Sequence, residues 1–279
     1  MNPQIEEILK GSYDLHVHAS PDSGAERRLD ALDTARYAYE AEMAGFVLKS
    51  HEYPTTPLAY VLNQMYPGLN VAGAIALNRA VGGLNARAVE VSANLGARVV
   101  WMPTFDAHTG MSRAGGGPGI TITDEDGHLK SEVSDILDII KEHDMVLASG
   151  HVSPAEAITL FREAKNKGIT RMIATHPGGI ATMDEHLEMA SLGAYLEHTF
   201  LSCMPDCMPD RARLSVPELV ATLRELGTEQ CVITTDFGQW MNPPAAEGMR
   251  MAIAALLGAG MEASEVATLV KGNPNQLIN

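Results

Sequence analysis

Two histidines separated by a single residue, His16 and His18, stand in the stretch YDLHVHASPD. Side chains alternate between the two faces of a β-strand, so residues two apart point to the same side. The pattern therefore offers two imidazoles to one space at the end of a predicted strand. Imidazole is the commonest protein ligand of metals, and two such groups make half of a zinc-type site.

Further side chains of ligand type stand at the ends of other apolar segments. FVLKSH contains Lys49 and ends in His51, MVLASGH ends in His151, RMIATH in His176 and CVITTD in Asp236. One such placement would carry little information. Histidines and an aspartate at the ends of several strands are not explained by core packing, and they indicate a shared metal or catalytic site.

The segments that must position these residues alternate between strand and helix patterns. Strands are predicted at 12–18, 46–51, 70–77, 98–104, 145–151, 171–176, 194–200 and 231–236. Helices are predicted at 29–44, 57–66, 85–95, 132–142, from Pro154 onward, and at 184–191, 217–226, 244–257 and 263–271. Nearly continuous apolar strands, each followed by a helix, are typical of a parallel sheet that is buried on both faces.

We therefore expect one domain over residues 1–279, a single (β/α)8 TIM barrel whose metal site lies at the C-terminal mouth of the strands. A doubly wound open sheet is the alternative, but no G-x-G-x-x-G turn follows the first strand. A polar insertion at 105–130, which contains RAGGGPG and a hairpin pattern turning at Asp126-Gly127, is expected to act as a lid.

Composition narrows the classes of partner. The 279 residues carry a formal charge of −15, and only 5% are aromatic, so neither a polyanion nor stacked bases fit as ligands. No apolar run is long enough to span a bilayer, and the N-terminus lacks the pattern of a signal peptide. With three cysteines, we expect a cytoplasmic protein that acts on a small molecule, without nucleic acid or membrane partners. A homo-oligomer stays possible.

The motifs DLHVH, SGH, ATHPGG and TTDFG, together with the C-terminal VKGNPNQLI, resemble the metal-dependent amidohydrolase superfamily. The resemblance spans most of the chain and implies a (β/α)8 barrel that holds one or two divalent metals. Zn²⁺ is the usual ion, and Mn²⁺ and Fe²⁺ are the other candidates. By this resemblance the metal ligands are His16, His18, His151, His176 and Asp236.

The sequence departs from that family at one position. Many members with two metals have a carboxylated lysine or a glutamate at the end of strand four, where this chain reads WMPTFD and has neither. Lys49, two residues before His51, stands on strand two instead. We hypothesise that Lys49 bridges two metals as a carbamate, because an uncompensated lysine in a barrel mouth is costly. The alternative is a charged Lys49 that forms an ion pair or orients substrate. Without a bridge the site would hold one metal, and His176 would polarise the substrate.

The implied reaction is hydrolysis. A divalent metal lowers the pKa of a bound water toward neutrality, so that hydroxide becomes available for attack on a carbonyl. The resemblance assigns to Asp236 the transfer of the water's proton to the leaving group. Substrate contacts are expected from His51, from Tyr53 and from Arg79, whose guanidinium matches a carboxylate. For Arg79 a surface cation, and for Tyr53 core packing, are equal alternatives.

The remaining histidines are expected to have structural or solvated roles. His198 is expected to form a structural hydrogen bond, with Glu197 beside it pointing away. The others, in loops or helices, are expected to be solvated: His108, His128, His143 and His186.

The sequence thus predicts a metal-dependent hydrolase of the amidohydrolase type that cleaves a C–N or C–O bond in a cyclic amide, amide, lactone or ester. A metal-dependent decarboxylase of the same superfamily is one alternative, because part of that superfamily uses a similar site with one metal. A barrel that binds a metal or ligand without turnover is another. A phosphoesterase that also begins with His-x-His is disfavoured, because TTDFGQ lacks the Asp-x-His ending of that family.

Overall fold

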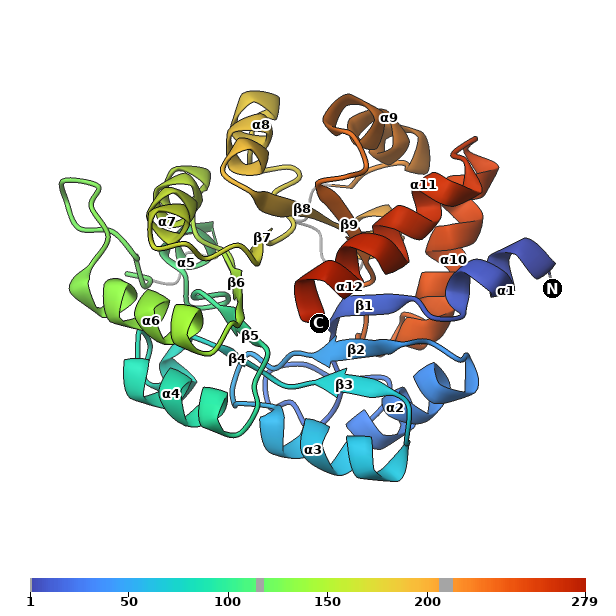
Figure 1. Cartoon of the computed structure of the whole chain (residues 1–279), viewed down its shortest axis with the longest axis horizontal. Coiled ribbons are helices and arrows are strands. Elements are labelled where there is room, and N and C mark those ends of the chain that lie inside the picture. Colours follow the sequence, from blue (N-terminus) through green and yellow to red (C-terminus); the bar gives the residue numbers. More distant parts are fainter. Residues whose placement is uncertain (1, 114–117, 206–212) are drawn as a thin grey trace. The chain divides into compact units, whose positions relative to one another are not determined.

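The computed structural model describes residues 2–113, 118–205 and 213–279 (Figure 1). The chain forms two compact units. Unit 1 contains Met1–Leu48, Leu58–Ala72 and Glu197–Asn279, and unit 2 contains Lys49–Pro57 and Gly73–Leu196. Strand β8 (Ala194–Thr199) begins in unit 2 and ends in unit 1.

Unit 1 is built around a parallel sheet in the order β1-β2-β3, whose strands lie side by side in Figure 1. Its strands are β1 (Tyr13–Val17), β2 (Gly45–Leu48), β3 (Asn70–Ala72) and β9 (Cys231–Thr234). Its helices are α1 (Pro3–Leu9), α2 (Ala31–Glu40), α3 (Thr56–Met65, which starts in unit 2), η2 (Phe200–Cys203), α9 (Val216–Leu226), α10 (Ala245–Gly258), α11 (Ala263–Ala267), the π-helix η3 (Thr268–Gly272) and α12 (Asn273–Ile278).

The segment after β9 runs parallel to the end of β1. Val17 and Phe237 form a parallel bridge. The backbone N–H of His18 donates to the carbonyl of Phe237 over 2.8 Å, and that of Asp236 donates to the carbonyl of His16 over 2.9 Å. The end of β1 and the segment after β9 are thereby hydrogen-bonded together at the position of the His-x-His pair.

Unit 2 contains a parallel sheet in which β4, β5, β6 and β7 pair in sequence order and β7 pairs with the first half of β8. Its strands are β4 (Ala74–Ala76), β5 (Val99–Trp101), β6 (Val146–Ala148) and β7 (Met172–Ala174). Its helices are η1 (Arg79–Val81), α4 (Ala86–Asn94), α5 (His108–Arg113), α6 (Ser131–Glu142), α7 (Pro154–Asn166) and α8 (Met183–Ser191).

The strand predicted at 70–77 is divided at Gly73 into β3 and β4. A side chain at Gly73 would place its Cβ only 2.4 Å from Cα of Thr56. The neighbouring Thr55 accepts a hydrogen bond from the backbone N–H of Ala74 with its hydroxyl, over 2.9 Å. The close approach of this second segment interrupts the ladder, and apolar periodicity alone does not reveal it.

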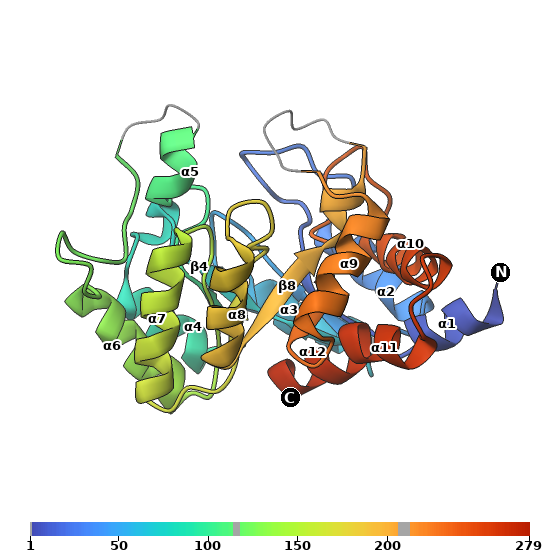
Figure 2. The ribbon, with the colours of Figure 1, turned by 90° about the horizontal axis from the view of Figure 1, so that it is seen from above.

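Helix starts follow the side chains that cap them. Ser153 and Glu156 form a reciprocal capping box at the start of α7, where Pro154 occupies the first turn as predicted. The same box recurs with Ser215 at α9 and with Thr182 at α8. Helices α7 and α8 lie alongside each other in unit 2 (Figure 2).

The predicted lid falls partly outside the described residues, because 114–117 are not among them. The predicted turn within it is present, since Gly127 has a φ of +82° and Thr123 and Leu129 form an antiparallel bridge. The strands themselves are almost wholly buried, including every residue of β1. Among the described helices, none combines the length and the apolar character needed to cross a membrane.

Candidate metal centre

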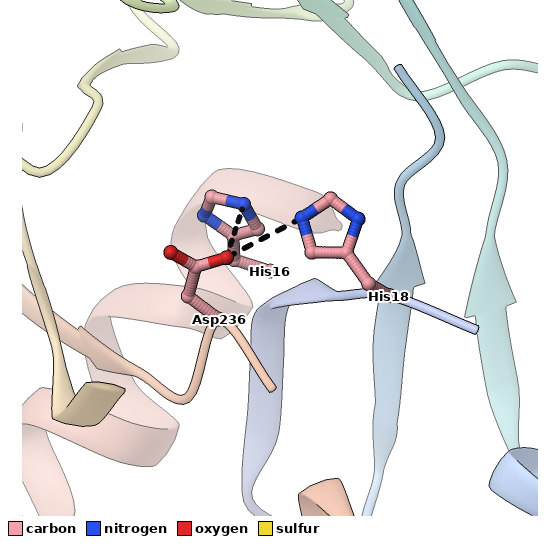
Figure 3. Close-up of side chains that lie close together, drawn as sticks. All are labelled: His16, His18 and Asp236. Atoms are coloured by element: carbon pink, nitrogen blue, oxygen red, sulfur yellow. Dashed lines mark ion pairs between the residues drawn. The ribbon is translucent and has the colours of Figure 1, made fainter. Parts of the chain in front are cut away.

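His16, His18 and Asp236 come together in unit 1 (Figure 3). Oδ1 of Asp236 lies 3.2 Å from Nε2 of His16 and 3.3 Å from Nε2 of His18. The three possible ligand atoms all lie within 4.8 Å of one another, and all three residues are buried. This is the arrangement of two imidazoles and a carboxylate that the strand ends predicted.

The backbone around Asp236 is shaped to bring its carboxylate to the histidines. Asp236 has a φ of +55°, in the left-handed region that non-glycine residues rarely adopt. Its carbonyl accepts a hydrogen bond from Nε2 of Gln239 over 2.8 Å. At Gly238, a Cβ would lie 2.2 Å from the carbonyl oxygen of His18. Only glycine lets the chain after β9 pass so close to the His-x-His strand.

Asp14 joins β1 and the segment after β9 through buried hydrogen bonds. Its carboxylate accepts hydrogen bonds from the hydroxyl of Thr235 over 2.6 Å, from the backbone N–H of Thr235 over 3.1 Å and from that of His16 over 3.2 Å. Burial raises the pKa of the Asp14 carboxyl to about 7, although the bonds from Thr235 and His16 act in the opposite direction. This residue therefore fixes the backbone of His16 and that of Thr235, which precedes Asp236.

Glu197, at the end of β8, sets the proton position on His16. Oε1 of Glu197 lies 2.9 Å from Nδ1 of His16 and accepts a second hydrogen bond from the hydroxyl of Thr234, also over 2.9 Å. Both side chains are almost fully buried. Because a carboxylate only accepts, Nδ1 of His16 carries a proton in this contact, and Nε2 is the nitrogen that faces Asp236.

The donor set fits a divalent cation. Nε2 of His16 lies 3.2 Å from Oδ1 of Asp236, so an imidazole nitrogen and a carboxylate oxygen, both of ligand type, lie side by side. Burial first, and then the charge of Arg27, lower the pKa of His18 to about 3, so its imidazole is neutral, which is the form that binds metals. Two imidazoles and a carboxylate are typical zinc ligands.

The role of Glu197 is not apparent from the sequence. Its side chain is expected there to point away, whereas in the structure it contacts His16, the first histidine of the site. The available signal was a charged residue inside the otherwise apolar strand AYLEHTF. A carboxylate buried in a barrel strand needs a hydrogen-bond donor, and a metal-binding histidine is a common one.

The second group of predicted residues lies in unit 2. The rings of His151 and His176, which follow β6 and β7, have their centroids 4.9 Å apart. His51 lies 6.1 Å from His151 and stacks on Phe105 with a centroid distance of 3.7 Å. His176 has a φ of +29°, so its backbone, like that of Asp236, is held in an uncommon conformation.

Lys49 is also in unit 2 and is only 2% exposed. Its Nζ lies 4.9 Å from the centroid of the Trp101 ring. This is the geometry of a cation–π contact, which is favourable for an ammonium and not for an anionic carbamate. The carbamate and the charged form of Lys49 both stay predictions.

The other two predicted substrate contacts, Arg79 and Tyr53, differ in their surroundings. Arg79 forms an ion pair with Asp106 over 3.0 Å, and its Nη2 donates to the carbonyl of Pro118 over 2.7 Å. Its side chain is about half exposed, and its guanidinium thus links η1 to the segment after β5. Tyr53 is half-buried in the segment that follows His51.

One expectation about the remaining histidines is wrong. His186, on α8, is 5% exposed and not solvated, and burial lowers its pKa. His198 is buried, while His108 and His128 are exposed as expected, and His143 is half-buried. The helical position of His186 did not reveal which face of α8 packs inward.

Comparison with known proteins gives a family and a fold. The family model described as "Family of unknown function (DUF6282)" matches residues 11–197. No curated protein sequence matches the chain at a significant level.

Solved structures resemble the chain over almost its whole length at low sequence identity. An amidohydrolase from Pseudomonas aeruginosa has a TM-score of 0.67 at 13% identity, with 98% of each chain covered. The probable dipeptidase PvdM from the same organism has a TM-score of 0.65 at 12% identity, with 98% of this chain and 96% of that chain covered. Organophosphorus hydrolase from Deinococcus radiodurans has a TM-score of 0.60 at 11% identity, with 96% and 92% covered.

At these identities the likeness establishes the fold. The chain has the fold of these hydrolases, and the predicted fold class, a (β/α)8 barrel, is confirmed.

Proposed function

The chain belongs to the family of unknown function DUF6282 and has the fold of the metal-dependent amidohydrolases, and from this premise we propose that it is a metal-dependent hydrolase. In this proposal it activates water to cleave a C–N or C–O bond of a small cyclic amide, amide, lactone or ester. The observation that carries the proposal is the buried cluster of His16, His18 and Asp236, with Glu197 orienting His16.

His16, His18 and Asp236 would hold the metal, for which Zn²⁺ is our first choice and Mn²⁺ and Fe²⁺ are the alternatives. His151 and His176, at the ends of β6 and β7, are proposed as further ligands. A carbamate on Lys49 would bridge two ions. A charged Lys49 with His176 as the polarising group corresponds to a single ion.

The bound metal would supply a water of lowered pKa and a positive charge beside the scissile carbonyl. Asp236, whose Oδ1 lies beside both histidines, is proposed to take the proton of the water and pass it to the leaving group. Glu197 keeps the proton of His16 on Nδ1 throughout. His51, Tyr53 and Arg79 are proposed to contact the substrate.

The neighbours in fold support hydrolysis and differ in the bond that their names imply, since they include an amidohydrolase, a probable dipeptidase and an organophosphorus hydrolase. The charge of −15 supports a small-molecule substrate and argues against nucleic acid. A cytoplasmic location without membrane contact and a possible homo-oligomer complete the proposal.

The test is an activity screen of the zinc-loaded full-length protein against lactones, p-nitrophenyl esters and cyclic amides. We expect Asp236→Asn to lower kcat by at least about 10³-fold while leaving the circular dichroism spectrum unchanged, because Asn cannot carry the proton. Asp135→Asn, at an exposed position on α6, is the matched control and should retain full activity. Near-full activity of Asp236→Asn would refute the role of this residue.

The same screen separates the alternatives. A metal-replete protein that releases CO₂ from a carboxylated substrate and hydrolyses none of the panel is a decarboxylase. A protein that binds metal and turns over neither class is a binding barrel.

A further inference from the structure

Asn78, the second residue after β4, is 2% exposed and is not among the predicted site residues. Its Oδ1 accepts hydrogen bonds from two backbone N–H groups, those of Thr104 over 2.8 Å and Asp106 over 3.2 Å. A backbone N–H can only donate, so these two bonds fix which end of the side-chain amide is the oxygen. The opposite end of Asn78 is therefore the NH2 group.

The two hydrogens of that NH2 group have defined acceptors. Nδ2 of Asn78 donates to the backbone carbonyl of His51 over 2.9 Å and to the hydroxyl oxygen of Thr104 over 2.6 Å. Asn78 thereby connects the end of β4 to the segments that follow β2 and β5. All three residues belong to unit 2.

The hydroxyl of Thr104 connects the amide of Asn78 to the ring of His51. Oγ1 of Thr104 lies 2.8 Å from Nδ1 of His51, and Thr104 is fully buried. Since the oxygen already accepts from Asn78, its single hydrogen is available for the histidine. If Nδ1 carried the proton instead, the hydroxyl hydrogen would have no acceptor among the described residues.

Two further contacts fix the position of His51. Its ring stacks on Phe105 at 3.7 Å with an interplanar angle of 16°, and its backbone carbonyl is fixed by Asn78. With Nδ1 as the acceptor, the neutral ring carries its proton on Nε2. In this tautomer Nε2 carries a hydrogen and has no lone pair with which to bind a metal.

We propose that Asn78 and Thr104 are positioning residues that hold His51 as the Nε2–H tautomer, so that His51 donates a hydrogen bond to a substrate oxygen. The oxygen is the carbonyl of the amide, lactone or ester, which becomes negative during attack, and His51 is therefore neither a metal ligand nor a general base. The substrate part of this inference rests on the proposed function; the tautomer part rests on the hydrogen bonds alone.

The tautomer is tested by ¹⁵N NMR on the full-length protein labelled at its histidines, with the signal of His51 assigned by its loss in His51→Gln. We expect the wild type and Thr104→Ser, which keeps the hydroxyl, to show a protonated Nε2 and an unprotonated Nδ1. Thr104→Val, which matches the shape of threonine without the hydroxyl, should lose this single tautomer. A wild-type spectrum with a protonated Nδ1 would overturn the inference, and so would an unchanged Thr104→Val spectrum. The wild-type spectrum decides the tautomer by itself if Thr104→Val does not fold.

Metal content and kinetics test the role of the ring. We expect His51→Ala to bind as much zinc as the wild type, and a loss of zinc would overturn the inference. On a p-nitrophenyl ester or lactone that the wild type hydrolyses, His51→Ala should lower kcat about 10²- to 10³-fold with little change in KM. An unchanged kcat would overturn the donor role. Failure to hydrolyse any probe would refute the proposed hydrolase and leave the tautomer and zinc results to stand separately.

Discussion

The proposed chemistry depends on single protons at named atoms. Glu197 places a proton on Nδ1 of His16, so that Nε2 is the nitrogen that faces Oδ1 of Asp236. In unit 2 the hydroxyl of Thr104 donates to Nδ1 of His51, so that the proton of this ring is on Nε2. The same side-chain type thus serves as a metal ligand in one place and as a hydrogen-bond donor in the other, according to the partner of its second nitrogen.

Glu197→Gln tests the orientation of His16. The amide can still accept from Nδ1, but it removes the negative charge that makes the imidazole a stronger ligand. We expect zinc affinity, measured by competition with a chromophoric chelator, to fall about 10- to 100-fold. Glu132→Gln, exposed on α6, is the matched control. An affinity equal to that of the wild type would mean that Glu197 does not act through His16.

Asp14 gives a pH prediction at the residue scale. Its pKa is about 7 in the folded protein against an ordinary value of 3.8, so between these values the unfolded chain has lost a proton that the folded chain keeps. The contribution of Asp14 to stability is therefore fully present below about pH 4 and falls as the pH rises to about 7. The difference corresponds to about 4 kcal/mol at most.

Asp14→Asn keeps the shape and removes this titration. In urea unfolding of the metal-free protein, we expect the variant to gain stability relative to the wild type as the pH rises from 4 to 8. Asp135→Asn should show no such trend. A stability difference between Asp14→Asn and the wild type that stays constant over this range would contradict the raised pKa.

At the scale of elements, strand ends were predictable and the contacts between distant segments were not. The apolar runs predict the buried strands, and the spacing of the two histidines predicts that they share one face of β1. Capping residues such as Ser153 mark helix starts. The break at Gly73, the partner of Glu197 and the hydrogen bonds of Asn78 each depend on a residue remote in sequence. A single sequence does not state such pairings.

Gly238→Ala tests how closely the segment after β9 must approach β1. The added Cβ would lie 2.2 Å from the carbonyl oxygen of His18, and the φ of +147° is itself unfavourable for alanine. We expect a loss of at least about 2 kcal/mol in the free energy of unfolding, measured by denaturant titration. Gly258→Ala, at the end of α10 with open space around it, should cost nothing or stabilise by about 0.5–1 kcal/mol. Equal stabilities of the two variants would contradict the close approach.

At the scale of the whole molecule, the fold and the hydrolase class depend on different observations. The (β/α)8 fold follows from neighbours that cover almost the full chain at 11–13% identity. The proposed activity depends instead on side chains whose geometry is specific to this protein, above all the buried cluster in unit 1. Substrate choice in such folds is decided by loops, and the sequence alone did not indicate how the segment at 105–130 folds.

The most direct test of the account is the metal content of the full-length protein after zinc loading and removal of free ions, measured by elemental analysis. We predict at least one zinc per chain in the wild type, and loss of that ion when both His16→Ala and His18→Ala are introduced, while the exposed His108→Ala and His128→Ala pair retains it. A wild type that emerges without metal, or a His16/His18 variant that keeps its full zinc content, would contradict the central claim that these two imidazoles and Asp236 hold a metal.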